Sequence, residues 1–363
     1  MHRLTLLLLL AAPCAAQPAD SLSARLDRIV DAAHAAGAFD GVVLVGRGDS
    51  VVYERAVGTA DRSWNVPNTL ETRFPWASLT KQLTATVVLQ LVGEGGLTLD
   101  TPLGDVLPGL RPEHAGRVRI RHLLSNASGL PDTDAIDGFY VAPDSLRGAL
   151  VDAALTADLA FEPGSTFRYD NLDFIVLARV VEALAAQPFA DALRARVLVP
   201  AGMTETVPID DTRVEPRLAT AALTLGGGRF GPPPPVRLAA FGAAGALAGT
   251  AGDLFRFDRA LLDGRLITPA LRDSMFTPER ALGFVALSVW TYRFDAGQTG
   301  APRPARLAER QGWIGGYRAL NLLAPDDDTV LIVLANTDAA DLSRTYTGTG
   351  FSASLIRAAL LPE

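Results

Sequence analysis

The chain has 363 residues, of which 48% are hydrophobic and 20% are charged, and its formal net charge is −7. These values are ordinary for a globular protein that is long enough to bury a large core. The acidic balance argues against nucleic acid and against an anionic membrane surface as general partners.

Residues 1–16 are predicted to be a signal peptide that is cleaved after Ala16. A short basic start precedes an apolar run too short to span a bilayer, and small residues come before Gln17. Cys14, the only cysteine, would leave with this peptide, so the mature protein could form no disulfide. Cys14 could instead anchor a lipoprotein, but Pro13 makes a poor processing site. We therefore expect a periplasmic or secreted protein without stable membrane insertion.

The next predicted elements are a helix, a β-hairpin and a second helix. Residues 21–36 repeat apolar side chains at helical intervals behind a serine cap. Residues 41–58 contain two β-rich runs around a GRGDS turn, which is typical of a hairpin. The stretch SLTKQLTATVVLQLVGEGG, residues 78–96, predicts a helix with Ser78 in its first turn.

The middle of the chain, residues 98–240, has a mostly helical pattern that Pro and Gly interrupt, with its clearest helix over 171–186. The end returns to β patterning and closes with a helix. The predicted strands are 283–294, 317–324 and 329–336, and the final helix is 351–361.

This order predicts an α+β fold with an antiparallel sheet that is flanked by helices and built from both chain ends. Residues 17–363 would form one catalytic domain. Its α/β lobe would comprise residues 17–97 and 241–363, and a large, mostly helical lobe would be inserted as residues 98–240.

Lys81 is the only lysine among 33 basic residues, and it lies three residues after Ser78. That spacing places both side chains on one face of a helix. Arginine can replace lysine at a solvated surface but cannot lose its proton, whereas a desolvated lysine can act as a base. The pair therefore suggests a serine nucleophile with a lysine base.

Two further stretches carry residues suited to acyl transfer. Tyr169 and Asn171 flank Asp170 just before the predicted helix of 171–186, and the Gly-rich RQGWIGGYRAL begins at Arg310. A serine, a lysine, a tyrosine and an asparagine, with a Gly-rich strand that can approach a substrate through its backbone, are the components of an acyl-transfer site.

On these motifs the chain resembles the serine β-lactamase and penicillin-binding-protein superfamily, in its class C β-lactamase-like branch. That branch also holds D-aminopeptidases, D,D-carboxypeptidases and esterases. Ser78 and Lys81 match its Ser-x-x-Lys pattern, and Tyr169 and Asn171 match its Tyr-x-Asn pattern. IRHLLSNASGLPD, FEPGSTFRYDN, FGAAGALAGTAGDLFRF and WIGGYRALNLLAPDDDTVLIVLAN resemble further family segments, in the expected order.

The resemblance implies a β-lactamase/transpeptidase-like fold and a role for each matched residue. Ser78 would be the acylated nucleophile, Lys81 would help to remove its proton, and Tyr169 would be the partner acid or base. Asn171 would orient Lys81 and a substrate amide or carbonyl. The backbone N–H groups of Ser78 and Trp313 would form the oxyanion hole. No metal or organic cofactor is implied.

The third motif departs from the family pattern. The family pattern has Lys or His at the first position, Thr, Ser or Gly at the second, and Gly at the third. This chain has Arg310, Gln311 and Gly312 at these positions. Arg310 could hold a substrate carboxylate, even bidentately, or it could be a plain strand-edge arginine. Gln311 puts efficient β-lactam handling in doubt. Asp170 replaces a small residue, and it would point away from the cleft if its two neighbours point inward.

The remaining alternatives concern other chemistries and other functions. His34, His114 and His122 could suggest a triad or a metal site, but no pair has metal-ligand spacing and no Gly-x-Ser-x-Gly motif exists, so structural roles are expected. We predict an exported serine hydrolase acting on an ester or amide, possibly in a D-amino-acid-containing peptide. A β-lactamase is the alternative enzyme, and a catalytically weak binding or regulatory protein is the alternative of another class.

Overall fold

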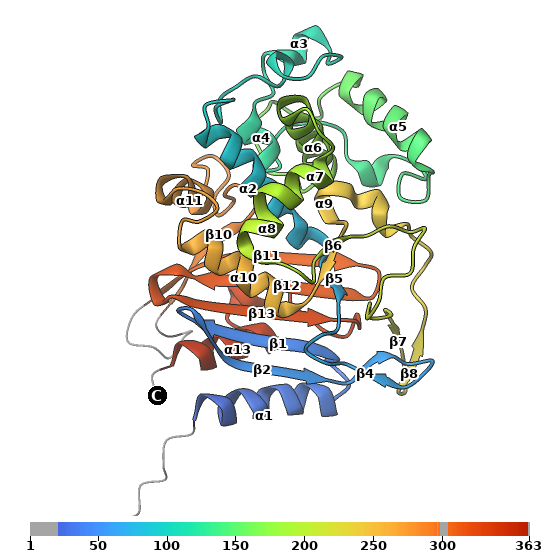
Figure 1. Cartoon of the computed structure of the whole chain (residues 1–363), viewed down its shortest axis with the longest axis vertical. Coiled ribbons are helices and arrows are strands. Elements are labelled where there is room, and N and C mark those ends of the chain that lie inside the picture. Colours follow the sequence, from blue (N-terminus) through green and yellow to red (C-terminus); the bar gives the residue numbers. More distant parts are fainter. Residues whose placement is uncertain (1–20, 296, 298–303, 362–363) are drawn as a thin grey trace, which may run out of the picture.

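The computed structural model describes residues 21–295, 297 and 304–361. The predicted signal peptide lies outside these residues. A six-stranded antiparallel sheet forms the centre of the molecule, in the order β10-β11-β12-β13-β1-β2 (Figure 1). Its strands are β1 (Gly41–Arg47), β2 (Ser50–Val57), β10 (Trp290–Phe294), β11 (Ala305–Ile314), β12 (Tyr317–Ala324) and β13 (Thr329–Ala335).

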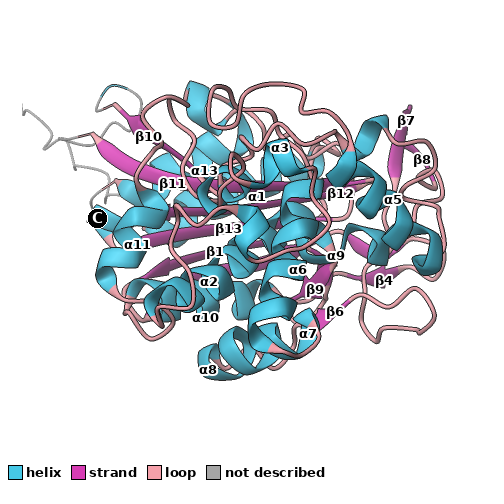
Figure 2. Ribbon diagram, turned by 90° about the horizontal axis from the view of Figure 1, so that it is seen from above, coloured by secondary structure: helices cyan, strands magenta, loops and turns pink. Residues whose placement is uncertain are grey.

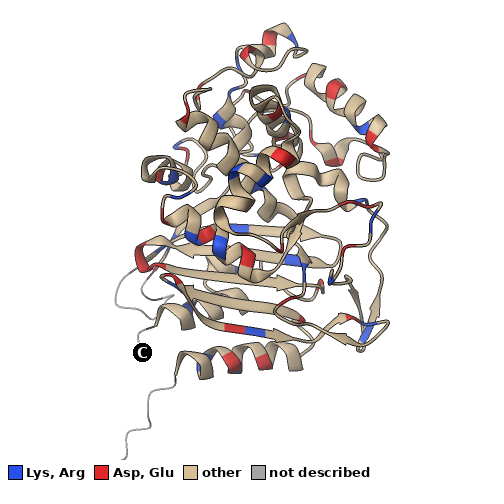
Figure 3. Cartoon of the chain, in the orientation of Figure 1, with Lys and Arg blue, Asp and Glu red and all other residues tan. Residues whose placement is uncertain are grey.

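The two ends of the chain meet within this sheet, where β1 pairs with β13. Their antiparallel register joins Gly41 to Ala335 and Arg47 to Thr329. β13 is buried along its whole length, and β1 along all but its last residue, so both faces of the sheet are covered. Figure 3 accordingly shows almost no charged residues on these two strands. The predicted α+β fold, with a sheet made from both chain ends, is confirmed.

Alternate residues of the central strands face two separate cores, as the two-residue period of a strand requires. Val42 and Leu44 face the core beneath the helical lobe, whereas Val43 and Val45 face the core closed by the terminal helices. The terminal helices are α1 (Leu22–Ala35) and α13 (Gly350–Leu360), and the first core is covered by α2 (Thr80–Gly93), α10 (Ala251–Leu262) and α11 (Pro269–Phe276).

The region predicted as a helical lobe, residues 98–240, is helical mainly in its first part, which lies above the strands in Figure 1 and in front of them in the view of Figure 2. Beyond Ala201 it forms short strands and irregular segments, because three consecutive glycines from Gly226 and four prolines from Pro232 do not support a helix. Its elements are α3 (Pro112–Ala115), α4 (Ile120–Leu124), α5 (Asp144–Thr156), α6 (Leu172–Ala185), α7 (Phe189–Leu193), a π-helical turn (Arg194–Leu198), α8 (Val199–Ala201), β6 (Val207–Pro208), β7 (Leu223–Gly226) and β8 (Arg229–Gly231).

Two strands near the C-terminus also differ from the predictions. The strand expected over 283–294 begins only at Trp290, because Ser288 adopts a φ of +70° in a turn before it. The ranges predicted as strands do not include β11, which carries the third motif. The remaining short elements are β3 (Thr59–Asp61), β4 (Val66–Pro67), β5 (Phe74–Pro75), α9 (Gly242–Gly245) and β9 (Leu247–Gly249). Within the described ranges, no helix has the length and apolar character needed to cross a bilayer.

Candidate active site

Ser78 lies in a short 3-10 turn, Ala77–Leu79, immediately before α2 rather than in the first turn of α2 as predicted. Ala77 has a φ of +49°, a conformation that is strained for a residue with a Cβ. The turn is anchored by the buried Trp76, whose backbone N–H donates to the carbonyl of Leu247 at 2.8 Å. An anchored, strained turn holds the serine hydroxyl in one position.

Gly312 allows β11 to pass directly against this turn. A Cβ at residue 312 would lie 2.3 Å from the carbonyl oxygen of Trp76 and 3.1 Å from the Cβ of Ala77. The pairing of β11 with β10 ends at Glu309, so residues 310–314 pair with β12 alone. The other edge of β11 therefore borders the space in front of Ser78, as a backbone-lined oxyanion site requires.

Lys81 is completely buried at the centre of the site. Its Nζ lies 3.2 Å from Ser78 Oγ, 2.9 Å from Tyr169 OH, 2.6 Å from Asn171 Oδ1 and 2.8 Å from the Ala244 carbonyl oxygen. An ammonium group has only three N–H donors for these four oxygens. A neutral amine can donate to Asn171 and Ala244 while its lone pair accepts the proton of Ser78 or Tyr169.

The surroundings of Lys81 favour that neutral form. Burial lowers the pKa of Lys81 to about 8, the charge of Tyr169 opposes the shift, and the charge of Arg310 adds to it. A fraction of Lys81 is thus a neutral amine near neutral pH, as its predicted role as a base requires. The helix α2 supplies this residue one turn after Ser78.

Tyr169 completes the proton-transfer group. Its side chain is partly exposed, but its hydroxyl lies between Lys81 Nζ and Ser78 Oγ and is hydrogen-bonded to both. Burial raises the pKa of Tyr169, yet the positive charges of Lys81 and Arg310 outweigh this effect and bring it to about 8. Because Lys81 and Tyr169 titrate in the same range, they act as one coupled pair.

Asn171 is held from behind by a chain of hydrogen bonds. Its Nδ2 donates to Tyr140 OH at 2.7 Å, and that hydroxyl pairs with Thr133 Oγ1 at 2.7 Å. Asp170 points away from Lys81, because its Oδ1 accepts from the backbone N–H groups of Thr133 and Leu172 at 3.2 and 2.9 Å. The amide oxygen of Asn171 is thereby fixed toward Lys81.

The structure corrects the prediction for Arg310. The residue is 1% exposed, so it is not a surface strand-edge arginine, and it is not among the described residues that line the pocket. Its guanidinium lies between the rings of Tyr169 and Trp290, 5.0 and 5.2 Å from their centroids. Its Nε donates to the carbonyl of Ser78 at 3.3 Å. Its charge therefore acts on Tyr169 and Lys81.

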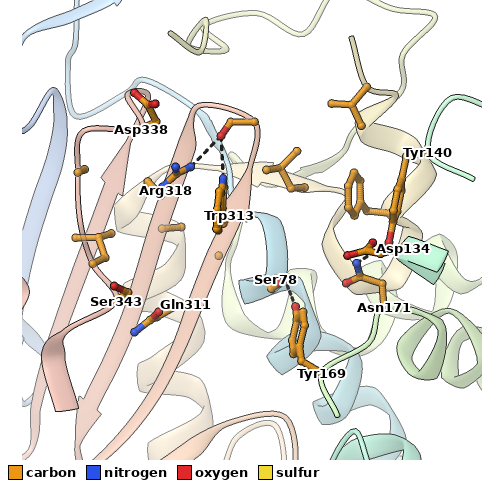
Figure 4. A pocket seen from close by; sticks show the side chains of 18 of the residues that line it. Ser78, Asp134, Tyr140, Tyr169, Asn171, Gln311, Trp313, Arg318, Asp338 and Ser343 are labelled. Carbon is orange, nitrogen blue, oxygen red and sulfur yellow. Dashed lines mark hydrogen bonds between the residues drawn. The ribbon is translucent and has the colours of Figure 1, made fainter. Parts of the chain in front are cut away.

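A pocket of about 820 Å³ opens in front of Ser78 and extends across the edge of β11 (Figure 4). Among the predicted site residues, Ser78, Tyr169, Asn171, Gly312 and Trp313 line it, and Lys81 lies behind them. Residues that the sequence did not point to also line it. They include Asp134, Tyr140, Pro235, Phe241, Arg318, Asp338 and Asp341.

These additional residues had no motif to reveal them. Tyr140 stacks on Phe241 with ring centroids 4.2 Å apart, and Arg318 lies over the ring of Trp313 at 4.4 Å. Tyr140 and Phe241 are distant in the sequence, whereas Trp313 and Arg318 face each other across the β11–β12 hairpin. Only the folded chain brings both pairs to one pocket.

The histidines lie outside this site. His34 Nδ1 lies 2.9 Å from Asp40 Oδ1, and His122 Nδ1 accepts the backbone N–H of Arg119. His114 is buried within the helical lobe, in α3. Over the described part of the chain, no three His, Cys, Asp or Glu side chains gather in a way that could bind a metal ion.

Comparison with known proteins agrees with this geometry. The model of the family named Beta-lactamase matches residues 26–349. The chain belongs to this family. The predicted superfamily is thus confirmed, and its fold is shared by the crystal structure of a penicillin-binding protein from Bacillus halodurans, with 25% identity, a TM-score of 0.73, and 91% of this chain and 97% of that chain covered.

Curated relatives of this Beta-lactamase family protein include hydrolases of two kinds. Esterase EstB of Burkholderia gladioli is 39% identical over 204 residues, which cover 52% of each protein. A D-aminopeptidase of Brucella anthropi is 37% identical over 178 residues, which cover 47% of this chain and 33% of that protein. The chain thus aligns with about half of the esterase and a third of the peptidase. Family and relatives identify it as a serine hydrolase.

Proposed function

We propose that this Beta-lactamase family protein is an exported hydrolase that cleaves esters or amides through an acyl-enzyme on Ser78, with D-amino-acid-containing peptides among its substrates. The observation that carries the proposal is the position of Lys81 Nζ, which is buried and in contact with both Ser78 Oγ and Tyr169 OH. The esterase and D-aminopeptidase relatives support the choice of bond, and the N-terminal pattern of residues 1–16 supports export.

Acylation begins when the coupled pair of Lys81 and Tyr169 has lost one proton. The pair takes the hydroxyl proton of Ser78 while Oγ forms a bond to the substrate carbonyl carbon. The carbonyl oxygen becomes an oxyanion, for which the N–H groups of Ser78 and Trp313 are the proposed donors. As the bond to the leaving group breaks, the pair returns the proton to the departing alcohol or amine.

Deacylation uses the same residues in reverse. A water molecule donates a proton to the pair while its oxygen attacks the acyl carbon, and the second tetrahedral intermediate collapses with cleavage of the bond to Oγ. The proton then returns to Ser78, which releases the carboxylic acid product. The partly exposed ring of Tyr169 keeps the proton-transfer group accessible to this water.

The test combines a covalent label with a panel of substrates. A fluorophosphonate should add once to the wild-type protein, as seen by intact mass, and should not add to Ser78→Ala of unchanged melting temperature. Turnover of p-nitrophenyl esters or D-amino-acid amides, exceeding that of nitrocefin, would support the proposal. Preferential turnover of nitrocefin would identify a β-lactamase. Labelling without any turnover would indicate the binding or regulatory protein, and wild-type-like turnover by Ser78→Ala would exclude this nucleophile.

A further inference from the structure

We propose that Gln311, positioned by Glu309, selects substrates that carry an ammonium or other N–H donor group over substrates that carry a carboxylate. This inference rests on the proposed function and concerns the same pocket. It gives a role to the residue that departs most clearly from the family's third motif.

Gln311 lines the pocket at the free edge of β11, and in the view of Figure 4 its side chain lies next to Ser343. Its Nε2 donates to Glu309 Oε1 at 2.6 Å. Residues 309, 311 and 313 point to the same face of a strand, so Glu309 lies directly beside Gln311 along β11. The amide is thus fixed by its neighbour two residues earlier.

Glu309 is itself held firmly. It is 1% exposed, and its other oxygen, Oε2, accepts from Tyr292 OH at 2.5 Å. Burial raises the pKa of Glu309 to about 7, so the carboxylate is ionised in the mildly alkaline range in which Lys81 and Tyr169 titrate. An ionised carboxylate can only accept hydrogen bonds.

This fixes the orientation of the Gln311 amide. The nitrogen must face Glu309, and the oxygen at the opposite end of the planar amide is left for a ligand. An amide oxygen attracts N–H groups and repels carboxylate oxygens. Where the family pattern has threonine or serine at this position, rather than glycine, the hydroxyl can donate to a carboxylate. Gln311 therefore changes which substrates fit.

The charges around the pocket favour the same substrates. Asp134, Asp338 and Asp341 line it, and Arg318 is the one basic residue among its described lining residues. The guanidinium of Arg318 is engaged, because it lies over Trp313 and its Nη1 donates to two backbone carbonyl oxygens at 2.8 and 2.9 Å. Three carboxylates against one arginine attract a cation to the pocket.

The test uses three p-nitroanilides that differ in one group on the carbon next to the scissile carbonyl. The D-alanine compound carries an ammonium group, the isobutyric compound a methyl group, and the methylmalonic compound a carboxylate. At one fixed pH above 7, the wild-type kcat/KM should decrease in that order. Gln311→Leu should lower the ammonium-to-methyl ratio about tenfold, which corresponds to about 1.4 kcal/mol.

A double-mutant cycle separates positioning from simple charge. Glu309→Gln should lower the same ratio, but in the Gln311→Leu background it should have no further effect. Gln90→Leu is the matched control, because the Gln90 amide bonds the carbonyls of Arg196 and Leu266 away from the pocket, and its ratio should equal that of the wild type.

Two results would overturn the inference. An unchanged ratio in Gln311→Leu would exclude Gln311 as the selective residue. An equal effect of Glu309→Gln in both backgrounds would show that Glu309 acts through its field and not through the amide. If the methyl compound is still hydrolysed, either result leaves the proposed function intact. A wild-type protein that is inactive on all three compounds and on the esters would overturn both the proposed function and this inference.

Discussion

Replacing Tyr169 with phenylalanine removes one oxygen from the centre of the proton-transfer group. That oxygen contacts Lys81 Nζ at 2.9 Å and is also bonded to Ser78 Oγ, so the variant loses the partner acid or base and keeps the ring. A positioned general acid or base contributes about 10²–10⁴ in rate. We therefore expect kcat/KM to fall by that factor, or about 3–5 kcal/mol in activation free energy.

The pH profile of Tyr169→Phe gives a sharper expectation. In the wild type, burial lowers the pKa of Lys81 to about 8, and the charge of Tyr169 opposes that shift. Phenylalanine carries no charge, so burial and the nearby Arg310 would lower the pKa of Lys81 further, with the charge of Asp170 still opposing them. The ascending limb of kcat/KM should lie near pH 8 in the wild type and should move to lower pH in the variant.

The fold should tolerate this change. Lys81 keeps the oxygens of Asn171 and Ala244, and the Tyr169 ring is already partly exposed. Loss of a typical hydrogen bond costs about 0.5–1.5 kcal/mol of unfolding free energy, so the melting temperature should change little.

The assay is kcat/KM against pH on one activated p-nitrophenyl ester, with thermal melting as the fold control. Tyr140→Phe is the matched control. It removes a hydroxyl that is hydrogen-bonded to Asn171 and Thr133 but not to Lys81 or Ser78. The kcat/KM of this variant should fall less than about tenfold. Near-native kcat/KM in Tyr169→Phe, or a limb that moves to higher pH, would refute the coupling of Tyr169 and Lys81.

Three other changes test separate parts of the structure. Lys81→Arg should reduce the rate of single-turnover acylation about 10²–10⁴-fold, since arginine stays protonated. It should also lower the melting temperature, because the site is fully buried. A native acylation rate would exclude a lysine base. Gly312→Ala should cost about 1–3 kcal/mol of unfolding free energy by overpacking, since its Cβ would lie 2.3 Å from a carbonyl oxygen; an unchanged melt would contradict this close approach. The proposed export predicts that the mature protein, sequenced directly, begins at Gln17, and a retained Ala16 would place the cleavage elsewhere.

Local sequence patterns were sufficient to predict several of the longer regular elements. The helices α1, α2, α6 and α13 and the β1–β2 hairpin lie close to the predicted ranges, because each depends on the spacing of apolar residues within one segment. The prediction was wrong where a turn interrupts an apolar stretch, as at Ser288. After Ala201, residues 202–240 form no α-helix, in a region where glycine and proline were expected to interrupt the helical pattern.

The sequence by itself determined which residue types the site has and that Ser78 and Lys81 lie about one turn apart, since that spacing is local. Only the tertiary structure decided how they work. The sheet and helices bring Tyr169 to Ser78 across 91 positions, bury Lys81 so that its pKa falls, and enclose Arg310 behind the pocket while leaving Gln311 on its wall. Burial and the approach of distant charges depend on long-range packing, which the spacing of residues along one segment does not encode.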